Sequence, residues 1–128
     1  MKNLFVPYEI ASLAKQKGFD EPCLGAFYSK TEEVSYGVAP YSYHKDILDT
    51  YPDFVLAPLY QQLINWFEEK HGMYIVPRVA YESDPIWWDW YILSIDHKKE
   101  VRADENESYP TKYEALNKAL EEAFKLIP

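Results

Sequence analysis

Three side chains of a metal-binding type stand close together before the middle of the chain. The spacing His44-x-Asp46-x-x-Asp49 could place an imidazole and two carboxylates on one helical turn. Neither a cysteine nor a second histidine stands nearby to complete the ligand set of a transition metal. Two carboxylates beside one histidine in a loop are more often helix caps and solvated charges. We therefore predict no metal ion and no other cofactor.

An acidic run, Asp104-Glu105-Asn106-Glu107, has the composition of the start of a calcium-binding loop. An EF-hand loop requires a glycine at its sixth position and a bidentate glutamate at its twelfth. Tyr109 and Ala115 occupy these positions here. The run is therefore predicted to be a solvated acidic turn.

Cys23 is the one cysteine of the chain and its candidate thiol nucleophile. A reactive thiolate needs a neighbouring base or positive charge, and the adjacent Glu21 and Pro22 supply neither. His71 and His97 stand in no recognised catalytic spacing, and the sequence contains no glycine-rich phosphate loop, nucleophile elbow or HExxH motif. We predict no catalytic residue. We keep as an alternative an enzyme whose catalytic residues come together from distant positions in the sequence.

The charge balance restricts the partners. Thirteen Lys and Arg against 21 Asp and Glu give the 128 residues a net charge of −8. Such a chain repels phosphate backbones unless its basic residues gather on one surface, so nucleic acid is a disfavoured partner. A lone cysteine allows no internal disulfide, the N-terminal MKNLFVPYEI lacks the apolar run of a signal peptide, and no run is long enough to span a membrane. We expect a cytoplasmic protein with no membrane partner.

Aromatic residues, 17% of the chain, are densest in the stretch IWWDWYILSI at 86–95. Trp, Tyr and Ile favour a pleated surface, so this stretch is predicted to be a central strand. Strands at 74–82 and 100–103, joined to it by hairpin turns, complete an antiparallel sheet. Shorter extended segments at 24–29 and 34–38 raise the number of predicted strands to five.

Three segments have the pattern of helices that cover this sheet. They run from Pro7 to Gly18, from Pro58 to Gly72, and over 112–127, where Thr111 and Glu114 form a capping box.

Between the first two helices lies a long loop over 39–58. One helical turn is predicted at 46–51, and the loop is anchored by the rings of Tyr41, Tyr43, Tyr51 and Phe54.

The predicted fold is a single α+β domain over 1–128, in the order α-β-β-α-β-β-β-α. An antiparallel sheet packs against two or three helices. Residues 1–56 supply the first helix, the hairpin and the tyrosine-rich loop. Residues 57–128 form a helix–three strands–helix unit.

Strand alternation divides the aromatic strand into two sides. The side predicted to face the core carries Ile86, Trp88, Trp90 and Ile92, joined by Met73, Ile75, Val79 and Tyr81 of the preceding strand. The other side, made wetter by Asp89, carries Trp87, Tyr91 and Leu93, joined by Tyr74, Arg78 and Glu82. We predict that Tyr74, Arg78, Trp87 and Tyr91 form a binding surface, because these residue types dominate interaction hot spots. The alternative is that residues 1–56 cover this side and make it a second core layer.

The segment TKYEALNKALEEAFKLI is similar to the final helix of the double-stranded-RNA-binding domain, and the order helix–three strands–helix is that of the same family. The family places lysines at three positions near the start of this helix. Here Lys112 matches, whereas Tyr113 and Leu116 occupy the other two positions. The resemblance implies nucleic-acid binding as an alternative function, which the missing lysines and the negative charge disfavour.

Three longer segments, FVPYEIASLAKQKGFDEPC, APLYQQLINWFEEKHG and YPTKYEALNKALEEAF, together resemble an uncharacterised family of small phage and prophage proteins of the Bacteroidetes. They span most of the chain. The resemblance implies a mobile-element setting and carries no activity, cofactor or site residue. We expect a non-catalytic protein-interaction or regulatory accessory, whose partner is another protein or a second copy of the chain.

Overall fold

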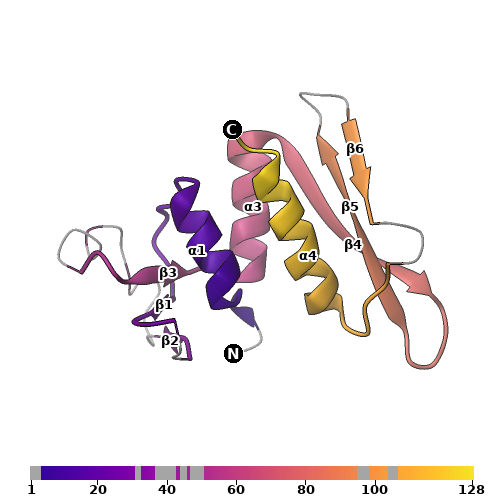
Figure 1. Ribbon diagram of the computed structural model, residues 1–128, viewed down its shortest axis with the longest axis horizontal. Coiled ribbons are helices and arrows are strands. Elements are labelled where there is room, and N and C mark those ends of the chain that lie inside the picture. Colours follow the sequence, from indigo (N-terminus) through magenta and orange to yellow (C-terminus); the bar gives the residue numbers. More distant parts are fainter. Residues whose placement is uncertain are drawn as a thin grey trace. The chain divides into compact units, whose positions relative to one another are not determined.

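The computed structural model describes residues 4–30, 33–36, 43, 46, 51–94, 99–103 and 107–128. The described elements comprise three helices and two antiparallel three-stranded sheets, which confirms the predicted α+β class (Figure 1). The chain divides into two compact units, Met1–Leu63 and Ile64–Pro128, called here the N-terminal and C-terminal units. The boundary falls within a helix, whereas the sequence suggested a division ahead of that helix.

The N-terminal unit begins with helix α1 (Tyr8–Gln16), whose N-cap is Pro7. Gly18 adopts a positive φ of 93°, and the Phe19 N–H donates to the Ala14 carbonyl oxygen at 2.9 Å. This is the bond of a Schellman cap, in which an apolar residue after the glycine packs back onto the helix. Phe19 is buried, so the predicted end of this helix is confirmed.

The sheet of this unit has the strand order β2-β1-β3, formed by β1 (Gly25–Phe27), β2 (Ser35–Tyr36) and β3 (Val55–Ala57). β1 is shorter than the segment predicted at 24–29, and residues 37 and 38 of the segment predicted at 34–38 lie outside the described part of the chain. β3 lies in the segment predicted to be a loop, so that part of the prediction is wrong. A run of three apolar residues is too short to show the alternation that identifies a strand in a sequence. β3 forms because its backbone pairs with that of β1. Of the helical turn predicted at 46–51, residues 47–50 lie outside the described part of the chain.

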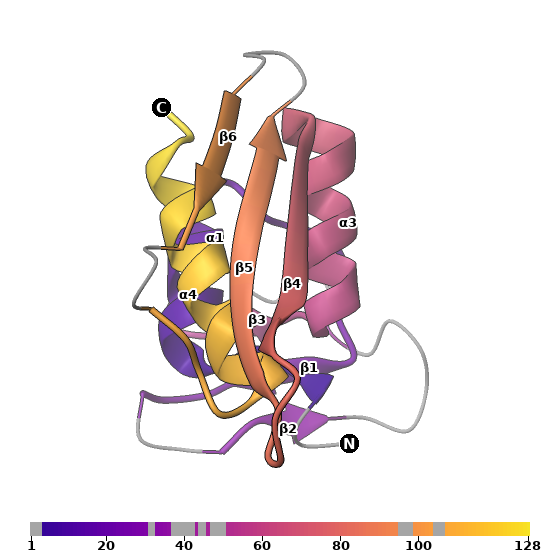
Figure 2. The same cartoon turned by 90° about the vertical axis from the view of Figure 1, so that its right-hand side faces the viewer.

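Helix α3 (Tyr60–His71) contains the boundary between the units and ends at Gly72, whose φ is 62°. The C-terminal unit then forms a sheet of order β4-β5-β6, from β4 (Met73–Tyr81), β5 (Trp87–Ser94) and β6 (Lys99–Arg102). The six strands thus lie in two sheets rather than one. Helix α4 (Lys112–Lys125) lies along one face of the second sheet (Figure 1, Figure 2).

Helix α4 forms where the capping box predicted it, since the Thr111 Oγ1 accepts a hydrogen bond from the Glu114 N–H at 3.1 Å. Its apolar stripe is buried against the sheet. From the C-terminal half of α3, Phe67 contacts Phe124 of α4 with ring centroids 4.8 Å apart. The core of the C-terminal unit is made by Trp66, Phe67, Met73, Ile75, Trp90, Ile92, Ala115, Leu116, Ala119, Leu120, Ala123, Phe124 and Ile127.

Strand alternation was predicted correctly along most of the sheet and wrongly at its hairpin end. Val79, Tyr81 and Ile86 were assigned to the core side, but all three are exposed. Val79 and Ile86 flank a turn whose residues are all exposed. Tyr81 changes side because the register shifts between Val79 and Tyr81, so that Tyr81 pairs with Trp87. Paired residues point to the same face, and the bulge therefore turns Tyr81 away from the core.

Candidate functional site

The β4-β5-β6 sheet presents one face to α4 and directs the side chains of the other face away from that helix. Figure 2 views the sheet from this second side, called here the outer face. Its residues follow from the alternation of side chains along each strand and from the pairing between neighbouring strands. They are Tyr74, Val76, Arg78 and Tyr81 of β4, Trp87, Asp89, Tyr91 and Leu93 of β5, and Glu100 and Arg102 of β6.

Two exposed apolar pairs lie toward opposite ends of the outer face. Tyr74 stands directly opposite Leu93, and Tyr81 stands opposite Trp87 near the hairpin turn. All four side chains are exposed. Cross-strand neighbours of this kind pack on each other and stabilise the strand pairing. They also leave large rings accessible on a rigid support.

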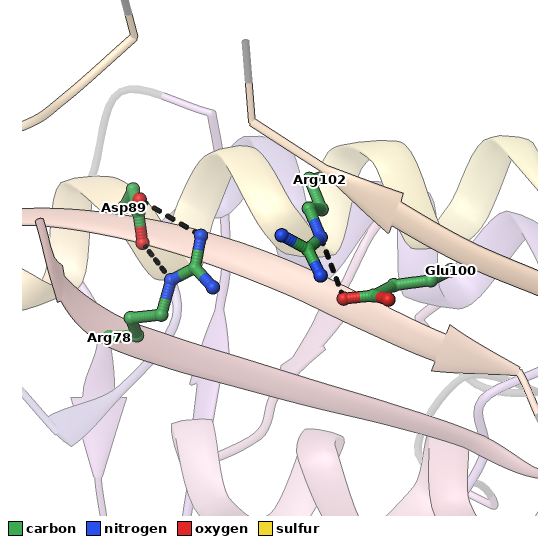
Figure 3. A network of polar contacts seen from close by, with 4 residues as sticks. All are labelled: Arg78, Asp89, Glu100 and Arg102. Carbon is green, nitrogen blue, oxygen red and sulfur yellow. Dashed lines mark hydrogen bonds and ion pairs between the residues drawn. The ribbon is translucent and has the colours of Figure 1, made fainter. Parts of the chain in front are cut away.

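A charged pair lies between the apolar ends. Arg78 is opposite Asp89, and its Nε and Nη2 donate to the two carboxylate oxygens at 2.8 and 3.2 Å (Figure 3). The guanidinium carbon also lies 5.4 Å from the centre of the Tyr91 ring, within cation–π range. The hydrogen bonds to Asp89 raise the pKa of Arg78 further above its ordinary value. The guanidinium is therefore held in place by two neighbours.

A second ion pair lies on β6, where Arg102 Nε donates to Glu100 Oε1 at 2.8 Å (Figure 3). These side chains are 58% and 37% exposed, against 40% and 17% for Arg78 and Asp89. The face thus holds two arginines and two carboxylates, and their charges sum to zero. The chain as a whole carries −8.

The four residues predicted to form a binding surface all lie on the outer face. Arg78 and Tyr91 are in contact, whereas Tyr74 and Trp87 lie toward opposite ends. The prediction did not include Glu100 and Arg102 in the surface. Their spacing of two residues in a predicted strand was a usable signal that they share a side.

Val76 and Tyr81 were also missing from the predicted surface. Val76 stands two residues after Tyr74 in the same predicted strand, so alternation already indicated that both side chains point to the same side. Tyr81 reaches the outer face through the bulge, and nothing in the residue types reveals that shift.

A second aromatic cluster lies in the N-terminal unit. Tyr28, just after β1, contacts Phe54 and Tyr43 with ring centroids 4.3 and 6.5 Å apart, and Tyr51 stacks on Phe54 at 5.0 Å. The Tyr28 and Tyr43 hydroxyls are hydrogen-bonded at 3.1 Å. These contacts confirm that Tyr43 and Phe54 anchor the segment to the residue after β1, whereas Tyr51 is exposed and stacks within the segment itself; Tyr41 lies outside the described residues.

Cys23 is buried, and its thiol donates to the Glu21 carbonyl oxygen at 3.3 Å. Burial, with a smaller contribution from the charge of Glu21, raises its pKa to about 12. The thiol is therefore protonated at neutral pH and is a poor nucleophile.

His71 packs against the Trp66 ring at 4.7 Å, and burial lowers its pKa. His44, Asp49, His97 and residues 104–106 lie outside the described part of the chain. Among the residues that are described, no three His, Cys, Asp or Glu side chains are placed to hold a metal ion.

The helix start that resembles an RNA-binding motif is divided between surface and core. Lys112 and Tyr113 are exposed in the first turn of α4, whereas Leu116 is buried. The third of the three positions therefore points into the core and is closed to a phosphate.

Comparison of the chain with protein-family models, curated proteins and solved structures gives no match. A search of the described helices finds none long and apolar enough to cross a membrane. What the chain does must therefore be argued from its own surface.

Proposed function

We propose that this chain is a non-catalytic protein-interaction or regulatory accessory of phage or mobile-element type, and that the outer face binds its protein partner. The observation that carries the proposal is the exposure of Tyr74, Tyr81, Trp87 and Leu93 on two paired strands. Exposed apolar residues gathered on one face mark interaction sites more often than residues scattered singly do. Trp, Tyr and Arg are the types that contribute most binding energy in such sites.

The outer face is also well ordered before any partner arrives. Its rings stand on β-strands rather than on a loop, and Arg78 is fixed by Asp89 and Tyr91. Binding therefore costs less side-chain entropy than it would for the same residues on a mobile segment. This favours recognition of a folded surface.

Nucleic-acid binding has weaker support. Both arginines of the outer face are paired with carboxylates, so the face offers a phosphate backbone no net positive charge. Leu116 is buried where the related RNA-binding helix carries a lysine. The enzymatic alternative also has weaker support, because the arginines and carboxylates that gather on the outer face are bonded to one another.

The mobile-element setting and a cytoplasmic location rest on the sequence. The three segments that resemble small phage and prophage proteins are the basis of the setting. If it is correct, the transcript of this chain rises with neighbouring phage genes when the element is induced by DNA damage. A transcript level that stays constant while those genes are induced would contradict the setting.

Photocrosslinking tests the outer face directly. A benzophenone side chain introduced at Leu93, in cells that produce the chain, should give a covalent protein adduct after illumination. The same group at Tyr113, exposed on α4, is the matched control and should not give that adduct. Adding Trp87→Ala to the Leu93 probe should reduce the yield. Equal adducts from both positions, or none from Leu93, would contradict binding at the outer face.

A further inference from the structure

We infer that the partner bound by the outer face is a second copy of this chain, docked face to face about a two-fold axis that runs along the strands between β4 and β5. This inference rests on the proposed function, because it requires the outer face to be an interaction surface. It goes beyond that function by specifying the occupant and its orientation. Two-fold dimers bury the same patch of both copies, so the patch must be complementary to itself.

The charge of the outer face favours a second copy. Two chains that each carry −8 repel one another, and any shared interface must avoid adding to that repulsion. The two arginines and two carboxylates of the outer face sum to zero. Two such faces can meet without bringing net like charge together, whereas a strongly basic partner would find no acidic surplus on this face.

The register makes the face complementary to itself about one particular axis. Four rows of outer-face residues cross β4 and β5: Tyr74 with Leu93, Val76 with Tyr91, Arg78 with Asp89, and Tyr81 with Trp87. A rotation of 180° about a line along the strands exchanges the β4 and β5 positions within each row. Tyr74 then meets Leu93 of the second copy, and Tyr81 meets Trp87 of the second copy.

The same rotation places Arg78 opposite Asp89 of the second copy. Arg78 bonds Asp89 of its own chain through Nε and Nη2, which leaves three of the five guanidinium N–H groups for a second carboxylate. A two-fold axis across the strands would instead place Arg78 opposite Arg78. The axis along the strands is therefore the one that closes an alternating ring of two arginines and two aspartates.

Charge reversal on the two strands tests this arrangement. We expect the wild-type chain to be dimeric by sedimentation velocity over a series from micromolar to millimolar concentration. Arg78→Asp or Asp89→Arg alone places like charges at the centre of the interface and should weaken self-association by at least about tenfold. A 1:1 mixture of the two variants should restore the dimer, because each then supplies the charge that the other lacks.

Two further variants guard against misfolding and nonspecific effects. The exchange Arg78→Asp with Asp89→Arg keeps a pair within each chain and should remain dimeric. Lys112→Gln, exposed on α4 and outside the outer face, removes one positive charge and should change the dissociation constant by less than about threefold. Restoration in the mixture also shows that both single variants fold.

A wild type that stays monomeric at every concentration would overturn the dimer, as would single variants that dimerise normally or a mixture that stays monomeric. The crosslinking result separates this failure from failure of the proposed function. A monomeric chain whose Leu93 adduct contains another protein retains the interaction function and loses the second copy. A monomeric chain with no Leu93 adduct loses both.

Discussion

The two sheets of this chain share an antiparallel three-stranded topology but differ in what their strands expose. Every residue of β1 and β3 is buried. Along β5, exposed and half-buried residues alternate with buried ones, and the exposed ones include Trp87 and Leu93. Two strands of the first sheet are enclosed while Tyr36 of β2 is exposed at its edge, whereas the second sheet keeps one face accessible.

The residue types explain the difference. Gly25 and Ala26 in β1 let neighbouring groups approach closely, and an added Cβ at Gly25 would lie 2.7 Å from a Phe5 ring carbon. The second sheet instead places large rings at positions that contribute little to the core. Trp87 and Tyr81 support the strand pairing but keep much of their surface exposed. The first sheet contributes buried packing, and the accessible face of the second is where we propose that a partner binds.

The largest expected difference in stability is between substitutions of two tryptophans that stand three residues apart on β5. Trp90 is 3% exposed and Trp87 is 36% exposed. Trp90→Ala should lower the free energy of unfolding by about 3–5 kcal/mol because it leaves a large cavity. Trp87→Ala should cost about 1 kcal/mol or less. Urea denaturation at a dilution that keeps the chain monomeric measures both. Equal costs would mean that Trp87 belongs to the core.

Gly25 tests how tightly β1 is packed in the first sheet. Gly25→Ala should destabilise by about 2 kcal/mol, because its Cβ would also lie 2.8 Å from a Val34 methyl carbon. The matched control is Gly18→Ala, where nothing lies within 4 Å and only the positive φ costs about 1 kcal/mol. Adding Phe5→Leu to Gly25→Ala should recover part of the loss.

The rate of Cys23 labelling by a thiol reagent reports opening of the N-terminal unit. The buried thiol, with its pKa raised to about 12, reacts only when that unit opens. Gly25→Ala should speed the labelling more than Trp90→Ala does. Equal acceleration would show that the two units unfold together.

The two ion pairs of the outer face should differ in their contribution to stability. Arg78→Gln leaves the largely shielded Asp89 carboxylate without its partner and should cost about 1 kcal/mol. Arg102→Gln breaks the more exposed pair and should cost less than about 0.5 kcal/mol. Thermal denaturation at low and high salt compares them. A larger loss for Arg102→Gln would contradict the assignment of Arg78 as the ordered centre of the face.

The smallest expected effect concerns the pH dependence of the C-terminal unit. Burial lowers the pKa of His71 below its ordinary value of 6.5. The unfolded chain therefore binds a proton more readily than the folded one, so stability contributed by neutral His71 is lost as the pH falls below 6.5. His71→Gln should flatten this decline. NMR titration of the imidazole should place its midpoint below the ordinary value of 6.5; a normal titration would contradict its partial burial against Trp66.

Much of the fold followed from local signals in the sequence. Helix α4 was predictable because Thr111 supplies a cap and the apolar residues recur at helical spacing. Gly18 and Gly72 marked helix ends because each adopts a positive φ. Strand β3 was not predictable, since its existence depends on pairing with β1 far away in the chain.

The sequence was enough to predict which residues of β5 share the outer face, but not which residues of β4 they pair with. Alternation placed Trp87, Asp89 and Tyr91 on one side without any structure. It could not show that Arg78 lies opposite Asp89, because that depends on the hairpin register. The bulge that moves Tyr81 arises from the pairing of two whole strands, and no residue in β4 signals it.

Pro77 has a consequence for how this chain resists aggregation. It lies opposite Trp90, whose carbonyl accepts from the Ala103 N–H on the side away from β4. In an antiparallel pair, the backbone groups of Pro77 then also point away from β5, toward the outer edge of the sheet. An added strand would find no amide donor there, because proline has none. An exposed sheet edge is a template for pairing with another chain, and Pro77 removes a donor near the middle of the β4 edge while leaving the aromatic face accessible.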